Sequence, residues 1–161
     1  EIVFRAGLST GMILIIVAVA NLIGFILAAE QIPLALAEWF QSNIASQAMV
    51  LFIINIALLV IGCFIDGGSA MIIFAPVLLP VILHFGIDPV FFGVMMTVNL
   101  MIGTITPPVG LSLFIAGGIA KVSLAKMSRA ILPFLLLEMA VLLLITYVPE
   151  TVMFLPRLFW N

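Results

Sequence analysis

The chain has few charged residues. Only 7% of its 161 residues are Asp, Glu, Lys or Arg, five of them are Lys or Arg, and the formal net charge is −2. This composition excludes nucleic acid as a partner, because binding to a phosphate backbone requires a basic surface. With one histidine and one cysteine, the chain offers no His cluster and no internal disulfide, and we expect Cys63 to be a buried, unreactive thiol. No haem, zinc or nucleotide motif is present, so we expect no organic cofactor.

Hydrophobic residues make up 66% of the chain, and the mean hydropathy is +1.48. These values lie far outside those of soluble domains and predict a polytopic, all-α membrane protein embedded in a lipid bilayer. The sequence begins at Glu1 without an initiator methionine or a signal peptide. We therefore expect it to be part of a longer protein.

The first unit, residues 1–46, is expected to contain one span and one interfacial helix. The run Leu8–Ala29 is long enough to cross the ~30 Å hydrocarbon core of a bilayer. Glu30–Ser46 then mixes apolar and polar residues around Trp39, which is typical of a helix at the water–lipid boundary. We interpret this unit as a scaffold or arm.

A polar interruption divides the second unit, residues 47–83. Ala48–Ile65 is apolar apart from Asn55, Asp66–Ser69 interrupts it, and Ala70–Leu83 follows with two prolines. The last segment is short for a crossing. We therefore predict a re-entrant hairpin with its tip at Asp66–Ser69, and two ordinary crossings remain the alternative.

The third unit, residues 84–120, carries no charge after Asp88. From Pro89 to Ala120 it is too long for one span unless it is broken. Thr106-Pro107-Pro108 removes two successive backbone donors, so the carbonyls one turn earlier lose their partners. The sequence predicts a discontinuous transmembrane helix made of two halves.

The fourth unit, residues 121–161, begins with a group of basic residues. Lys121, Lys126 and Arg129 predict a cytoplasmic loop by the positive-inside rule. We expect the last span to be Ile131–Val148. Glu138 then lies about eight residues into that span, and we expect it to reach water or a neighbouring helix.

Asp66 is one of few ionisable groups placed to reach the membrane interior. An unpaired carboxylate costs several kcal/mol there, so it needs a cation, a proton or dense hydrogen bonding. A hard alkali ion is a natural partner, and helix capping alone is the alternative. Gly67 and Gly68 allow close approach of a ligand, and Ser69 adds a hydroxyl near a helix N-terminus, which suits an anionic group.

The second interruption offers oxygen ligands without a fixed charge. Carbonyls freed by Pro107 and Pro108, with the hydroxyls of Thr104 and Thr106, form a set that suits Na⁺. The alternative is a structural proline kink whose hydroxyls bond the local backbone. Asn99 is a lone amide in an apolar helix, where interhelical hydrogen bonding is the common role.

Four blocks in this order resemble a known family, and the likeness extends over nearly the whole chain. They are Phe64-Ile65-Asp66-Gly67-Gly68-Ser69-Ala70, Ala75-Pro76-Val77-Leu78-Leu79-Pro80, Phe85-Gly86-Ile87-Asp88-Pro89-Val90-Phe91-Phe92-Gly93 and Asn99-Leu100-Met101-Ile102-Gly103-Thr104-Ile105-Thr106-Pro107-Pro108-Val109-Gly110. The Thr-Pro-Pro-Val-Gly block is the most specific. The sequence resembles the C-terminal half of the large membrane subunit of TRAP (tripartite ATP-independent periplasmic) transporters.

The resemblance implies a Na⁺-coupled importer of organic acids, such as C4-dicarboxylates or sialic acid, in the inner membrane of a bacterium. It implies an elevator built from two inverted repeats, of which this chain holds the second. The implied partners are the N-terminal half of the same subunit, a small membrane subunit and a periplasmic substrate-binding protein. The candidate Na⁺ ligands are Asp66, Gly67, Ser69, Gly103, Thr104, Thr106 and Pro107, and the candidate substrate contacts are Gly67, Gly68, Ser69, Asn99 and Thr106.

Other classes fit less well, and we do not expect an enzyme. An intramembrane aspartyl protease needs a second catalytic carboxylate, but Asp88 lies in a predicted surface turn. A structural assembly subunit has no need for two breaks at membrane depth. A proton-coupled permease is the closest rival, and it predicts that Asp66→Asn abolishes transport.

Overall fold

The computed structural model describes residues 46–159 continuously and, before them, only positions 3, 4, 7, 10, 11, 15, 18, 22, 25, 26, 29–31, 35, 38, 39 and 42. The predicted span 8–29 and interfacial helix 30–46 therefore lie largely outside the described residues. Residues 46–159 form α3 (Gln47–Phe64), α4 (Gly67–His84), α5 (Pro89–Thr104), α6 (Leu111–Ala120), α7 (Leu124–Tyr147) and α8 (Glu150–Phe159), without any strand. By length and composition, α3, α4 and α7 are candidate membrane spans. The prediction of an all-helical chain with membrane-spanning helices is confirmed to this extent.

The helices α3 and α4 meet at a sharp tip. Asp66 caps α4, because its side chain accepts a hydrogen bond from the backbone N–H of Ser69 at 3.1 Å. The cap draws both glycines and Ser69 into the first turn, so α4 has 18 residues, as many as α3. The prediction of a short second arm starting at Ala70 is wrong for this reason. Length no longer favours a re-entrant hairpin over two crossings, and the hairpin stays a prediction.

The predicted break in the helix after Asp88 is present, and that its two halves together cross the membrane stays a prediction. Asp88 caps α5 by accepting from the N–H groups of Val90 and Phe91, at 2.8 and 3.1 Å. The helix ends at Thr104, six residues form the break, and α6 begins at Leu111. The break contains a cis peptide bond between Pro107 and Pro108.

The segment after α6 differs from the prediction. Lys121 ends α6 in the left-handed conformation, and α7 begins at Leu124 rather than near residue 131. Lys126 and Arg129 therefore lie in the first turns of α7 and not in a loop, because both are good helix formers whose heads can extend toward water. The sequence reasoning also missed α8, which follows α7 after Val148 and Pro149.

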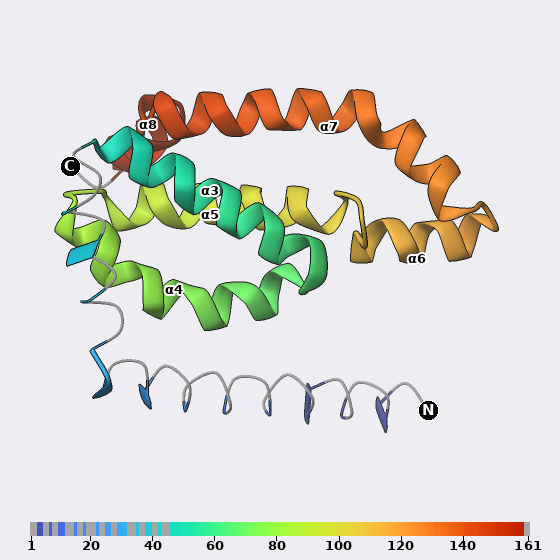
Figure 1. Cartoon of the computed structure of the whole chain (residues 1–161), viewed down its shortest axis with the longest axis horizontal. Helices are drawn as coiled ribbons and strands as arrows, with labels where there is room; N and C mark the ends of the chain where they lie inside the picture. The colour runs from blue at the N-terminus through green and yellow to red at the C-terminus, as the bar shows by residue number, and fades with distance from the viewer. Residues whose placement is uncertain are drawn as a thin grey trace.

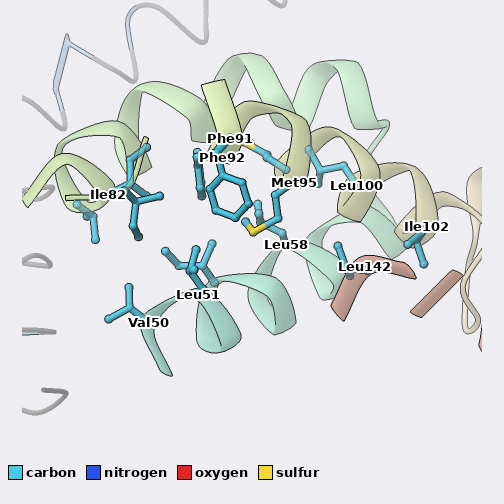
Figure 2. Close-up of a cluster of buried hydrophobic side chains, with 14 of the residues drawn as sticks. Val50, Leu51, Leu58, Ile82, Phe91, Phe92, Met95, Leu100, Ile102 and Leu142 are labelled. Atoms are coloured by element: carbon cyan, nitrogen blue, oxygen red, sulfur yellow. The ribbon is translucent and has the colours of Figure 1, made fainter. Parts of the chain in front are cut away.

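The central element is α5, which contacts α3, α4, α6, α7 and α8. In Figure 1 α7 crosses above α3 and α5, α4 lies below them, and the α3–α4 tip points toward the α5–α6 break. Figure 2 shows the core, where Leu51 and Leu58 of α3 lie beside Phe92 and Met95 of α5. Burial of these side chains fixes α3 against α5 and so positions the two interruptions.

Candidate functional site

The two interruptions lie against each other. The backbone N–H of Gly110, in the α5–α6 break, donates a hydrogen bond to the carbonyl oxygen of Cys63 at 3.2 Å. The thiol of Cys63 is 3.9 Å from the carbonyl oxygen of Pro107. Figure 1 shows the same arrangement, with the α3–α4 tip beside the point where α5 gives way to α6. Segments more than 40 residues apart in sequence thus form one polar region in an apolar chain.

Two glycines allow this approach. A Cβ on Gly103 would lie 2.6 Å from the Cα and 2.7 Å from the carbonyl carbon of Gly62. A Cβ on Gly62 would lie 2.9 Å from the carbonyl oxygen of Leu100. These distances are too short for any side chain, so α3 and α5 touch backbone to backbone just before both helices end. Small residues serve the same purpose in many transmembrane helix pairs.

At the tip, Asp66 is exposed and acts as the cap of α4. Its Oδ2 accepts from the N–H of Ser69 at 3.1 Å and lies 3.4 Å from the Ser69 hydroxyl. Among the described residues Oδ1 accepts no hydrogen bond, so one carboxylate oxygen can still bind a cation. Gly67 is buried, and a Cβ there would collide with the side chain of Met101 on α5. The capping role expected of Asp66 is confirmed, and it is compatible with a second role.

At the break, the prolines change which carbonyl groups are bonded. Pro107 and Pro108 have no N–H to donate to Gly103 and Thr104, the residues four positions earlier. The N–H of Thr106 bonds the Gly103 carbonyl at 2.9 Å instead. In the described part of the chain, no backbone N–H reaches the carbonyl oxygen of Thr104. This carbonyl is therefore available to a ligand.

Gly110 leaves space beside the carbonyl oxygens of Thr104 and Thr106. It has φ of 55°, and a Cβ placed on it would lie 3.1 Å from the Thr106 carbonyl oxygen and 3.3 Å from that of Thr104. A left-handed residue without a side chain is the one that fits here. Both oxygens therefore lie beside the space that a side chain at position 110 would occupy.

The threonine hydroxyls stabilise the break. Thr104 donates to the carbonyl oxygen of Met101 and Thr106 to that of Ile102, both at 2.7 Å. The hydroxyl of Ser112 on α6 is 3.2 Å from that of Thr104. Local bonding by these hydroxyls is what the proline-kink alternative expects. The hydroxyl oxygens keep lone pairs, so the same side chains can also contribute to a cation site.

Helix ends give the region one part that favours a cation and another that favours an anion. The C-termini of α3 and α5 and the N-termini of α4 and α6 all lie at the two interruptions. Carbonyl groups at C-termini favour a cation, and N–H groups at N-termini favour an anion. No side chain caps α6, which leaves its first N–H groups open. The described residues hold no group of three or more His, Cys, Asp or Glu. The ligands present are oxygens suited to a hard, singly charged cation and N–H groups suited to an anion.

Asn99 lies away from this region. It is fully buried one turn before Gly103, and its amide donates to the carbonyl and side-chain oxygens of Asn55 at 2.9 and 2.6 Å. Asn55 in turn donates to the hydroxyl of Thr146 at 2.9 Å. The amides thus join α3, α5 and α7, as interhelical packing predicts. A substrate contact by Asn99 stays a prediction that this placement does not support.

Sequence reasoning missed the residues that join the two interruptions. Gly62 and Cys63 were given no part in the site, and Gly110 was noted only within a motif. The signal that could have found them is a glycine at the end of each apolar run, Gly62 before the tip and Gly103 before the break. Paired small residues near the ends of two apolar helices predict a close crossing.

Comparison with known proteins identifies the family. The model described as tripartite ATP-independent periplasmic transporter, DctM component, matches residues 1–151. The chain belongs to the DctM family. The resemblance inferred from the four sequence blocks is therefore confirmed at family level.

Similar DctM-family proteins have several named substrates. The chain is 44% identical over 149 residues to the C4-dicarboxylate TRAP transporter large permease protein DctM of Rhodobacter capsulatus, covering 92% of this chain and 34% of that protein. It is 39% identical over 154 residues to the isethionate TRAP transporter permease protein DctMQ of Oleidesulfovibrio alaskensis, covering 96% and 24%. It is 36% identical over 149 residues to the sialic acid TRAP transporter permease protein SiaT of Haemophilus influenzae, covering 92% and 24%. The chain thus spans 24–34% of the length of these three relatives.

Proposed function

We propose that this chain forms the C-terminal repeat of the large membrane subunit of a Na⁺-coupled importer of an organic acid. The observation that carries the proposal is the contact between the two interruptions, through the bond from Gly110 to Cys63 and the crossing of Gly62 and Gly103. Broken backbone at membrane depth is tolerated where it lines a cavity or a binding site. The substrates named for the relatives, C4-dicarboxylates, sialic acid and isethionate, are all organic acids.

The proposed Na⁺ site uses the oxygens that the break leaves unpaired. The carbonyl oxygens of Thr104 and Thr106 both lie beside Gly110, and Asp66 has a free carboxylate oxygen at the adjacent tip. Na⁺ is carried with the substrate in this proposal. An ion between the tip and the break would attract both segments and hold them in one arrangement.

The proposed anion site uses the neighbouring N-termini. The N–H groups of Gly67 and Gly68 begin α4, and those of Leu111 and Ser112 begin α6. Neither set is occupied by a helical partner. An organic carboxylate or sulfonate at this place is favoured by both helix ends and by a bound Na⁺. Coupling then follows, because each ligand lowers the free energy of binding the other.

The wider assembly is also part of the proposal. The assembly includes a second, inverted repeat of the same subunit, a small membrane subunit and a periplasmic binding protein that delivers the substrate. It lies in a bacterial inner membrane and works by elevator-type movement. This agrees with the fraction of the relatives that the chain spans, 24–34%. The second repeat would supply the rest of both sites.

The test is uptake into proteoliposomes that hold the full-length permease with its membrane subunit. Uptake of C4-dicarboxylates, sialic acid and isethionate is measured with and without an inward Na⁺ gradient, and with and without the binding protein. We expect one of these acids to accumulate only when both are present. Uptake that follows a pH gradient and ignores Na⁺ would refute the proposed ion coupling and favour a proton-coupled permease.

A further inference from the structure

Glu138 lies near the middle of α7. The stretch from Arg129 to Tyr147 is helical throughout, and Glu138 is nine residues from each of these two residues. Nine residues of helix span about 14 Å. Arg129 and Tyr147 are residue types that favour the two water–lipid boundaries. The carboxyl group is therefore placed in the hydrocarbon layer, beyond reach of either surface.

A groove between α5 and α7 contains this carboxyl group. Its volume is about 460 Å³. Its lining consists of four α5 residues, the first residue of the α5–α6 break and three α7 residues: Thr97, Val98, Met101, Ile102, Ile105, Leu137, Glu138 and Val141. The Oε2 atom of Glu138 is buried and has no hydrogen-bond partner among the described residues. The one hydroxyl in the lining belongs to Thr97, and it already donates to the Gly93 carbonyl at 2.7 Å.

Lipid cannot supply a hydrogen bond to the carboxyl group of Glu138. Acidic side chains at the centre of a membrane helix cost about 2.5–3.5 kcal/mol on insertion scales, and they almost always face protein or a water-filled cavity. Acyl chains have no hydrogen-bond donor. The basic side chains of α7, Lys126 and Arg129, lie at its N-terminal end. A donor from a neighbouring protein segment at the same depth would satisfy Glu138.

We propose that the groove between α5 and α7 is occupied by a further transmembrane helix of the same permease, which presents an arginine or lysine to Glu138. Charge complementarity sets the residue type, because a basic group both bonds and neutralises a carboxylate. The apolar remainder of the lining suits the side chains of a helix. The relatives provide the necessary length, since the chain spans only 24–34% of it.

Photocrosslinking in the full-length permease tests the occupant directly. p-Benzoylphenylalanine replaces Leu137, which lines the groove and is 65% exposed, in membranes that also contain the small subunit. The matched control replaces Leu136, which is 71% exposed, is not part of the groove and lies on the face of α7 opposite Glu138. We expect the Leu137 probe to form an adduct with a permease peptide outside residues 1–161 that contains Arg or Lys in an apolar segment. We expect the Leu136 probe to form no such adduct.

A charge exchange tests the pairing. Glu138→Arg is expected to lower the amount of folded permease about tenfold, because it places two basic groups together in the membrane. Exchange of the crosslinked basic residue for Glu in the same protein is expected to restore the amount. Adducts with lipid alone, with the small subunit, or with a helix that lacks Arg and Lys would overturn the proposal. So would a failure of the exchange to restore folding. The crosslinking arm keeps Glu138 itself and does not depend on the stability of any Glu138 variant.

Discussion

Gly103→Ala is expected to separate the two interruptions. The added Cβ would lie 2.6 Å from the Cα of Gly62, whereas ordinary contacts begin at 3.4 Å, so the helices must move apart by about 0.8 Å. The atoms that block the methyl group belong to the α3 backbone and cannot rotate away. The bond from Gly110 to Cys63, at 3.2 Å, has little length to spare before it breaks.

Overpacking of this kind costs about 1–3 kcal/mol. If 1.4 kcal/mol of it falls on the ion-bound state, the Na⁺ concentration for half-maximal uptake rises about tenfold. Two assays measure the effect in the full-length permease, namely thermal unfolding in detergent and Na⁺-dependent uptake in proteoliposomes. We expect a lower unfolding temperature and a higher half-maximal Na⁺ concentration.

The matched control lies on the same helix. Gly93 of α5 has no atom within 4 Å of the position that its Cβ would take. Gly93→Ala is therefore expected to leave Na⁺ dependence unchanged and to stabilise α5 by up to about 1 kcal/mol. If Gly103→Ala unfolds at the wild-type temperature and keeps the wild-type Na⁺ curve, the close backbone crossing is wrong.

Three further predictions concern single groups. Asp66→Asn keeps a good helix cap and removes the charge, so we expect the wild-type unfolding temperature with weaker Na⁺ dependence of uptake, whereas Asp66→Ala also lowers stability by about 1 kcal/mol through loss of the cap. Complete loss of transport in Asp66→Asn would favour proton coupling. Thr106→Val removes the hydrogen bond to the Ile102 carbonyl and should weaken Na⁺-dependent uptake, while Thr106→Ser should retain that uptake. Equal uptake by the two variants would contradict a role for the hydroxyl. Asn99→Leu leaves the side-chain oxygen of Asn55 without its donor and should lower stability in thermal unfolding by about 0.5–2 kcal/mol, with little change in the KM for substrate. A large rise in KM without destabilisation would instead identify Asn99 as a substrate contact.

The sequence was most predictive where backbone chemistry decides the structure. Two prolines in succession end α5, and an aspartate followed by glycines begins α4, so both interruptions could be located from residue types alone. The length of α4 could not be judged in the same way. Whether Gly67 and Gly68 belong to the turn or to the helix depends on the cap bond between Asp66 and Ser69, and glycine is compatible with both.

The relation between the interruptions was harder to predict. A pattern of apolar residues shows that α3 and α5 are buried but not at which residues they cross. That crossing depends on a pair of glycines 41 residues apart and on side chains such as Leu58 and Met95 that pack around it. The start of α7 was predicted wrongly for another reason. Lys126 and Arg129 predict a loop as a charge pattern, but both residue types are compatible with a helix, and the helix begins at Leu124.

The crossing of Gly62 and Gly103 has a practical consequence for protein engineering. Because main-chain atoms form it, the framework of the site does not depend on the chemistry of the exposed tip. Gly68 is exposed, and the nearest atom to its added Cβ would be Oδ2 of Asp66 at 3.2 Å. A library that tests the proposed anion site should therefore vary position 68 and leave 62, 103 and 110 as glycine, so that the crossing of α3 and α5 is retained.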